Sequence, residues 1–277
     1  MFLSVSTHIF VYHTFREEFL SIVESCGIRS LEVFSSIPHF PYRDREFVRR
    51  FLSSAERRGI RVPTVHFPLY FHIDDIKKGR WTSLSTENDE LRLASVEETI
   101  ACALPLVIQG EGTLVIHTTF PGNEVPLKRK LLFKDSLERI LEALPDGISL
   151  ALENTAMPSG TSRAIVDLVR EFGEERLKVC IDVGHAHVAE EAPSAVVAAD
   201  GCLADVHISD NGGEEDEHLV PGEGTVPWKP VIDGLRKIGY DGPLTLELRD
   251  REKGERGEPA YFEDLILRGK EKIESFL

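Results

Sequence analysis

Six acidic or histidine residues stand at the ends of short apolar segments that recur along the chain. They are His66, His117, Glu153, Asp182, His207 and Glu247. Side chains of these types serve as metal ligands and as proton donors and acceptors in enzymes. Carboxylates held close together repel one another or take up protons unless a cation neutralises them. The six residues therefore predict a metal site with acid–base groups, provided that the fold brings the segment ends together.

Two loop segments add candidates for the same site. In one, His185 follows Asp182 by three residues, and in the other His218 follows Asp216 by two. The acidic run at residues 214–217 is typical of a solvated turn. Asp216 is singled out from this run only because His218 follows it by two residues. Mixed sets of histidine and carboxylate ligands suit zinc, manganese or magnesium, whereas thiolate-seeking metals select cysteine.

Short segments with the apolar character of buried strands alternate with longer segments of helical periodicity. The predicted strands are Leu3–Ser6, Ser30–Phe34, Val62–His66, Thr113–His117, Ser149–Glu153, Lys178–Asp182, Ala204–Ile208 and Leu244–Leu248. The predicted helices are Phe15–Cys26, Asp44–Arg58, Glu87–Gln109, Leu127–Leu144, Ser162–Phe172, Ala192–Ala199, Trp228–Ile238 and Tyr261–Phe276. Strand and helix thus alternate eight times.

This alternation predicts a fold of the α/β class, a single (β/α)8 TIM barrel formed as one domain by residues 1–277. An open doubly wound sheet is the alternative, but no G-x-G-x-x-G motif follows the first strand, where SVSTHIF stands instead. No low-complexity linker divides the chain. In such a barrel the carboxyl ends of the strands meet at one mouth, so the six strand-end residues are expected to converge there.

The inward positions of the barrel are expected to be filled by the residues two before these strand ends. They are Thr64, Val115, Ala151, Cys180, Asp205 and Thr245. Most are small, as a filled barrel requires. Asp205 departs from that pattern, and either a place at the lower rim or a buried partner would explain it.

Composition limits the classes of function that need to be considered. The chain has 277 residues with 32 Lys plus Arg against 47 Asp plus Glu, and thus a net charge of −15. The acidic balance disfavours a nucleic-acid partner without excluding one, because phosphate binding depends on basic patches. No apolar run approaches the roughly 20 residues that a bilayer requires, and no signal peptide is evident, so we expect a cytoplasmic protein. The four cysteines form no C-x-x-C pair, which predicts reduced thiols.

At this level the chain resembles the xylose-isomerase-like TIM barrel superfamily, which includes sugar isomerases and epimerases and the endonuclease IV-type apurinic endonucleases. The segments that carry the resemblance are Ala151–Thr155, Val179–His185, Val206–Asp210, Asp216-x-His218 with Pro221–Gly224, and Tyr240–Glu247. The resemblance extends over nearly the whole chain.

The two branches of the superfamily imply different metal sites. In the isomerases and epimerases, one divalent metal is held by groups that match Glu153, Asp182, His207 and Glu247. In the endonucleases, a three-zinc cluster is held by groups that match His66, His117, Glu153, Asp182, His185, His207, Asp216, His218 and Glu247. All nine residue types are present.

Departures from the endonuclease motifs favour sugar chemistry. Endonuclease-type chains have D-T-C-H where this chain has D-V-G-H at residues 182–185, and H-x-N-D-S-K where it has H-I-S-D-N-G at 207–212. The P-G-E-G segment followed by Pro227-Trp228 and the Y-D-G-P-L-T-L-E segment resemble the isomerase and epimerase branch more closely. Basic side chains that would grip a DNA backbone near these loops are replaced by glycine and acids.

The leading prediction is therefore a divalent-metal-dependent isomerase or epimerase of a sugar or sugar phosphate, with proton transfer through an enediolate. The resemblance implies that Glu153 and Glu247 are ligands and proton-transfer groups, and that His185 binds a substrate oxygen. Trp228 and Phe67 are candidates for an apolar substrate wall, with ordinary packing as the alternative. Manganese or zinc is preferred, with magnesium or cobalt as alternatives, at one to three ions per chain.

The main alternative is an endonuclease IV-type zinc-dependent apurinic/apyrimidinic endonuclease, a phosphodiesterase that uses a metal-bound hydroxide. A third reading is a binding protein that keeps the barrel and the metal without turnover. The expected partner is a small polyhydroxylated molecule, with no membrane involved. The sequence leaves open whether the protein forms a homo-oligomer.

Overall fold

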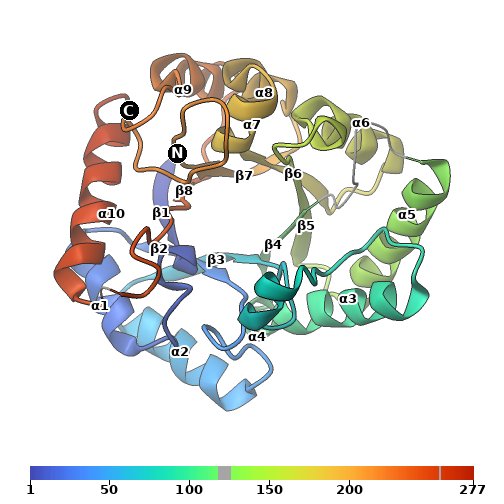
Figure 1. The fold of residues 1–277 in the computed structure, drawn as a ribbon, viewed down its shortest axis with the longest axis horizontal. Coiled ribbons are helices and arrows are strands. Elements are labelled where there is room, and N and C mark those ends of the chain that lie inside the picture. The colour runs from blue at the N-terminus through green and yellow to red at the C-terminus, as the bar shows by residue number, and fades with distance from the viewer. Residues whose placement is uncertain (118–125, 256) are drawn as a thin grey trace.

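Eight parallel strands form a closed barrel in the computed structural model, which describes residues 1–117, 126–255 and 257–277. Each strand pairs in parallel with the next along the chain, and β1 pairs with β8 to close the ring (Figure 1). The strands are β1 Phe2–Ser6, β2 Ser30–Phe34, β3 Arg61–His66, β4 Gly112–His117, β5 Ile148–Glu153, β6 Leu177–Asp182, β7 Leu203–Ile208 and β8 Pro243–Leu246. The predicted (β/α)8 barrel is confirmed.

The helices lie around the outside of this barrel (Figure 1). They are α1 Glu17–Ser25, α2 Arg45–Arg57, α3 Asp89–Cys102, α4 Leu104–Gln109, α5 Leu127–Ala143, α6 Ser162–Phe172, α7 Val183–Ala189, α8 Ala192–Ala198, α9 Trp228–Lys237 and α10 Pro259–Glu274. Three short 3-10 helices, η1 Thr7–Phe10, η2 Ile73–Lys78 and η3 Pro158–Gly160, lie in the connections. Over the described ranges, none of the helices has both the length and the apolar character needed to cross a bilayer.

Local sequence signals set the helix boundaries. The Oγ1 atom of Thr161 accepts a hydrogen bond from the amide of Ala164 at the start of α6, and Gly173 ends that helix with a φ of 70°. Between these caps α6 buries an apolar stripe that includes Ile165 and Val169. Caps of these kinds satisfy backbone groups that a helix end leaves unpaired, and the stripe fixes which face meets the sheet.

The structure differs from the predicted helices in two places. The predicted helix at residues 87–109 is two helices, α3 and α4, which meet at Ala103. Pro105 has no amide hydrogen and cannot continue the hydrogen-bond ladder of α3, so a second helix starts there. Helix α7 was not predicted because it follows β6 without a loop. The carboxylate of Asp182 caps it by accepting a hydrogen bond from the amide of His185 at 2.6 Å.

The barrel interior is apolar on one side and polar on the other. Val115, Ala151 and Cys180 form a small cluster separate from the main core, which lies between the sheet and the helices. Asp205 is fully buried, and its Oδ1 atom accepts a hydrogen bond from Thr245 Oγ1 at 2.9 Å. Thr245 is thus the buried partner that the sequence left unidentified.

A shift in strand register places Asp205 in the interior. Val179 of β6 pairs with Leu203 of β7, whereas Cys180 pairs with Asp205, so β7 contains one extra residue at this point. Beyond the irregularity, Asp182 pairs with His207. Side chains alternate along a strand, and the shift therefore turns both Asp205 and His207 toward the barrel axis.

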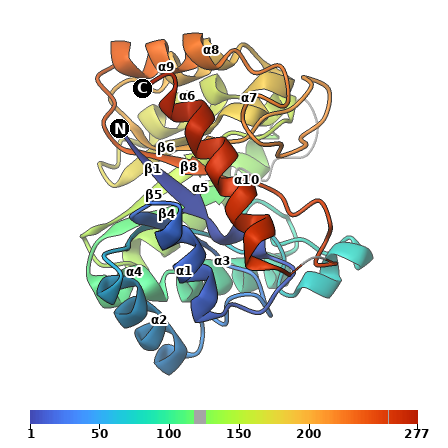
Figure 2. The ribbon, with the colours of Figure 1, turned by 90° about the vertical axis from the view of Figure 1, so that its left-hand side faces the viewer.

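The last helix packs beside the first on the outside of the barrel. Figure 2 shows α10 running across the side of the molecule where β1 and β8 meet. The Nζ atom of Lys270 on α10 donates a hydrogen bond to the carbonyl of Cys26, the C-cap residue of α1, at 2.8 Å. This packing covers the junction between the first and last strands, so the seam of the barrel is protected from water.

Candidate metal centre

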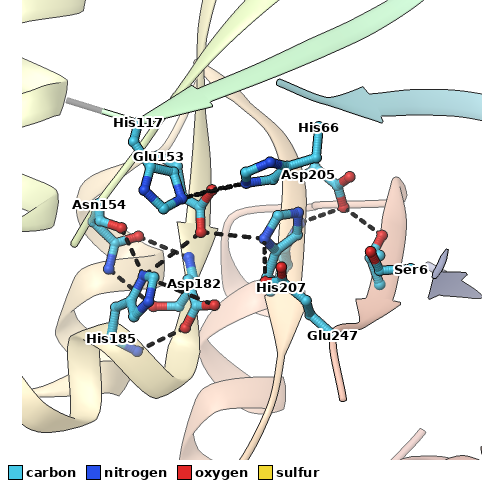
Figure 3. Close-up of polar contacts among 12 residues, drawn as sticks. Ser6, His66, His117, Glu153, Asn154, Asp182, His185, Asp205, His207 and Glu247 are labelled. Carbon is cyan, nitrogen blue, oxygen red and sulfur yellow. Dashed lines mark hydrogen bonds and ion pairs between the residues drawn. The ribbon is translucent and has the colours of Figure 1, made fainter. Parts of the chain in front are cut away.

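Nine predicted site residues gather at the carboxyl ends of the strands and in the segments that follow them. Figure 3 shows these residues other than Asp216 and His218. His66, His117, Glu153 and Asp182 are the last residues of β3, β4, β5 and β6, and Glu247 directly follows β8. Seven of the nine are buried, and only His117 and Asp216 are partly exposed. Among the described residues, several overlapping groups of ligand atoms lie close enough to hold a cation. They include His66, His117 and Glu153; His66, His207 and Glu247; and His185, Asp216 and His218.

The first group centres on one carboxylate oxygen. Glu153 Oε2 lies 3.0 Å from the Nε2 atoms of both His66 and His117, and these two nitrogens are 3.3 Å apart. The Nδ1 atom of His66 is 2.8 Å from the carbonyl of Phe67. A carbonyl only accepts, so Nδ1 of His66 carries a proton. Nε2 faces Glu153 and His117, and in the neutral ring its lone pair would be available to a metal at that position. This is the orientation in which an imidazole binds a metal.

The second group centres on His207. Its Nδ1 atom lies 3.2 Å from Glu153 Oε1 and 3.1 Å from Glu247 Oε2. On the other edge of the ring, Nε2 lies 3.1 Å from Oε2 of Glu32, a fully buried residue of β2. Glu32 was missed by the sequence analysis because it lies within a predicted strand and not at its end. The one feature of the sequence that could have revealed Glu32 is that it is an acid within the otherwise apolar end of the strand segment SLEVF.

The third group lies on α7 and in the loop after β7. Asp216 Oδ2 is 3.0 Å from Nε2 of His218 and 3.4 Å from Nε2 of His185. Each ring donates its Nδ1 hydrogen to a carbonyl, His185 to Asn154 at 2.9 Å and His218 to Glu247 at 2.8 Å. Burial alone would lower the pKa of His218, but the facing Asp216 carboxylate outweighs it and raises the pKa to about 9. Both imidazoles are thereby fixed with Nε2 toward one carboxylate.

Asp182 lies at the centre of the site with one oxygen unpaired. Its Oδ1 atom caps α7, whereas its Oδ2 atom is buried and has no hydrogen-bond partner among the described residues. Burial raises the pKa of Asp182 to about 6, His185 opposes the shift, and the charges of Glu153 and Glu247 add to it. A buried carboxylate oxygen is normally paired, so this one fits a cation ligand. The donor set of carboxylates and imidazoles fits a divalent metal.

The acids and imidazoles of the centre also stabilise one another electrostatically. Burial alone would raise the pKa of Glu153, but His117 and His207 hold it well below its usual range. Burial would likewise raise the pKa of Glu247, and His207 and His218 lower it instead. Ligand imidazoles must be neutral to bind a metal, so metal binding here would release protons.

A cavity of about 230 Å³ lies over the centre. Its floor includes Glu247, His117, His185, Asp216 and His218, whereas the fully buried Glu153 does not reach it. The walls include residues that the sequence analysis did not single out, among them Tyr12, Tyr70, Trp81 and Arg249. Tyr70 and Trp81 come from the long connection between β3 and α3.

The two predicted wall residues do not line this cavity. Phe67 is fully buried, with its ring centroid 5.7 Å from those of His66 and His117. Trp228 is also buried, and its Nε1–H donates a hydrogen bond to Asp210 Oδ2 at 2.9 Å. The structure thus places Phe67 behind the candidate ligands and Trp228 at the base of the loop after β7.

Asp210 organises the loop that carries the third group. Its carboxylate accepts hydrogen bonds from the amides of Asn211, Gly222 and Val226 at 2.6–3.0 Å, in addition to the indole of Trp228. Within this loop His218 adopts a φ of 49°, in the left-handed region that non-glycine residues rarely occupy. Such strain persists where the surrounding structure enforces it, and it is common at functional sites.

Comparison with known proteins identifies the family. Residues 20–267 match the family model described as "Xylose isomerase-like TIM barrel". The chain belongs to this family. The expectation drawn from the sequence motifs is thereby confirmed, including the barrel architecture.

Several proteins and structures of related sequence or fold are known. An uncharacterized protein of Methanocaldococcus jannaschii is 32% identical over 152 residues, which cover 50% of this chain and 52% of that protein. A D-psicose 3-epimerase of Enterocloster bolteae is 31% identical over 88 residues, 31% of this chain and 28% of that protein. The chain thus spans about half or less of the length of these two relatives.

Solved structures match over the whole barrel. A D-tagatose 3-epimerase-like protein superimposes with a TM-score of 0.78 at 22% identity, covering 100% of this chain and 98% of that chain. A D-psicose 3-epimerase crystallised in the presence of D-fructose gives a TM-score of 0.74 at 17% identity, with 98% and 97% coverage. At these identities the likeness concerns the fold.

Proposed function

We propose that this protein is a divalent-metal-dependent isomerase or epimerase of a small sugar or sugar phosphate. The observation that carries the proposal is the position of Glu247, which faces both the candidate ligand His207 at 3.1 Å and the cavity. A carboxylate in this position can hold a metal and exchange a proton with a substrate carbon. Relatives and structures named as D-psicose 3-epimerases support the same chemistry.

The chain's own residues have distinct roles in this proposal. Glu153, Asp182, His207 and Glu247 hold the metal, for which manganese or zinc is preferred. A bound divalent cation would polarise a substrate carbonyl and stabilise the negative charge of an enediolate. Glu247 takes the proton from the adjacent carbon, because its carboxylate reaches the cavity and stays ionised. The resemblance also implied proton transfer by Glu153, but Glu153 does not line the cavity, so its proposed role is to hold the metal.

His185 is proposed to position the substrate. It lines the cavity, and its ring is held by the hydrogen bond from Nδ1 to the carbonyl of Asn154. The fixed ring keeps Nε2 at the cavity, 3.4 Å from Asp216 Oδ2, where a substrate oxygen would bind. A cytoplasmic location remains a prediction from the sequence.

Solvent hydrogen exchange tests the proposal. Incubation of the manganese-loaded protein with a panel of ketoses in heavy water should incorporate deuterium at the carbon beside the carbonyl, because the enediolate must regain a proton from an exchangeable group. Glu247→Gln should lower the exchange rate by roughly 10²- to 10⁴-fold, since the amide cannot accept the proton. Exchange at the parent rate in this variant would remove Glu247 from the mechanism.

The grouping of the nine residues also favours a second candidate, a multi-metal phosphodiesterase. Several groups of ligand atoms that could hold an ion lie side by side, as a multi-metal hydrolase would require, and two of these groups share His66. We therefore propose counting metal ions per chain and assaying a duplex with one abasic site in parallel. Three ions with efficient strand cleavage would replace the sugar proposal, whereas deuterium incorporation without cleavage would support it.

A further inference from the structure

One basic side chain lines the cavity together with the acids and imidazoles of the centre. Arg249 lies two residues beyond Glu247, in the segment that follows β8. Arg249 is exposed and forms no ion pair with any residue that the structure describes, whereas Arg251 pairs with Glu217 at 3.9 Å and Arg268 pairs with Glu223 at 2.5 Å. In a chain with 47 acidic residues, an unpaired guanidinium at the mouth is available for a ligand.

The backbone on both sides of Arg249 is fixed. Its amide donates a hydrogen bond to the carbonyl of His218 at 3.3 Å, which links it to the third ligand group. The next residue, Asp250, is fully buried and accepts hydrogen bonds from the amides of Glu252 and Gly254 at 3.0 and 2.8 Å. Tyr261 Oη donates to the same carboxylate at 3.2 Å. The guanidinium is therefore carried by an ordered segment, which lowers the entropy lost when a ligand binds.

The surroundings of Arg249 strengthen its attraction for an anion. Tyr70, Ile73 and Trp81 form an apolar part of the cavity wall, and walls of low dielectric reduce the screening of a charge inside a cleft. The net charge of −15 does not cancel this attraction, because surface charges farther away than about 8 Å are screened at physiological salt. Guanidinium groups bind carboxylate and phosphate oxygens in a bidentate manner.

We propose that Arg249 is the specificity-determining residue of the cavity and that it selects a ketose bearing an anionic group, either a phosphate or a carboxylate. The inference rests on the proposed isomerase or epimerase function, to which it adds the class of substrate. In this arrangement the anionic group contacts Arg249, while the hydroxyl and carbonyl oxygens face Glu247 and His185.

Binding measurements test the inference separately from turnover. D-fructose, D-fructose 6-phosphate and D-fructuronate would be titrated into the manganese-loaded protein by calorimetry. At least one of the two anionic ketoses should bind 10- to 100-fold more tightly than D-fructose, and the ligand that does so identifies phosphate or carboxylate. Arg249→Ala should abolish this difference by lowering the affinity for the anionic ketose 10- to 100-fold. Arg251→Ala is the matched control, because Arg251 lies on the same segment and does not line the cavity.

The outcomes distinguish this inference from the proposed function. Equal affinity for neutral and anionic ketoses, no binding of either anionic ketose, or an anion preference that survives Arg249→Ala would overturn the inference. Deuterium exchange into D-fructose would then still support the isomerase or epimerase proposal. Conversely, an Arg249-dependent preference for an anionic ketose without exchange into any ketose would support the anion subsite and contradict the proposed reaction.

Discussion

The Nε2 atom of His207 lies 3.1 Å from Oε2 of Glu32, on the edge of the ring opposite to the candidate metal ligands. The contact keeps the Nε2 proton on the side of Glu32 and leaves Nδ1 free to face Glu153 and Glu247. Glu32 would therefore influence a bound metal through the orientation of His207, without lining the cavity.

Replacement of Glu32 by glutamine should lower the affinity for manganese by roughly 10- to 100-fold, because the amide holds the His207 tautomer less firmly. Competition with a chelator gives this affinity directly. Glu46→Gln is the control, since Glu46 is an exposed residue of α2 that pairs with Arg50. Parent-like affinity in Glu32→Gln would show that the contact does not position His207.

The strands were predicted within two residues because each ends in a recognisable way. The observed bounds of β2 and α6 are identical to the predicted ones. The observed strands β3 to β7 each start one residue earlier than predicted. Buried parallel strands are continuous apolar runs, and a polar residue marks the end of β1 and of β3 to β6. Helix α7 had no such boundary, because Asp182 both ends β6 and caps the helix.

The site was predictable where its residues stand at strand ends and not elsewhere. Glu32 was missed because its role depends on a contact with His207, a residue 175 positions away. Arg249 gave no signal, since an arginine near the end of a strand is ordinary in sequence. The walls formed by Tyr70 and Trp81 depend on the path of the connection after β3, and periodicity does not describe such a path.

Metal content tests the assignment of the ligands. The combined change of Glu153→Gln with Asp182→Asn should reduce the divalent metal bound after metal-replete purification by tenfold or more, since both residues supply buried carboxylate oxygens at the centre. Elemental analysis measures the loss. The control is Asp233→Asn, because Asp233 is an exposed residue of α9 that forms an ion pair with Lys229. As much metal in the double variant as in the parent would show that the site lies elsewhere.

Gly224 tests the order of the loop after β7. A Cβ atom at this position would lie 2.3 Å from the carbonyl oxygen of Asn211 and 2.4 Å from Asp210 Oδ1. Gly224→Ala should therefore lower the free energy of unfolding by about 1–3 kcal/mol, measured by denaturant titration. Gly212→Ala in the same loop is the control, because the nearest atom to its Cβ would be Glu217 Oε2 at 3.5 Å, an ordinary contact. Equal stabilities of the two variants would contradict the close approach at Gly224.

His39 should make stability depend on pH away from the metal centre. It is fully buried, its Nδ1–H donates to the carbonyl of His13 at 2.7 Å, and its Nε2 atom has no hydrogen-bond partner in the described ranges. Burial lowers its pKa to about 4, although the hydrogen bond to His13 opposes the shift. In the unfolded chain the histidine pKa is about 6.5. Between pH values of about 4 and about 6.5 the unfolded chain therefore binds more protons than the folded protein.

The free energy of unfolding should accordingly fall as the pH drops from about 6.5 to about 4, with a contribution of about 3 kcal/mol from His39. Denaturant titrations at several pH values should give a shallower dependence for His39→Gln, because glutamine does not titrate. His72→Gln, at a partly exposed histidine beside Asp74, should retain the slope of the parent. A parent-like slope in His39→Gln would assign the acid sensitivity to other buried groups.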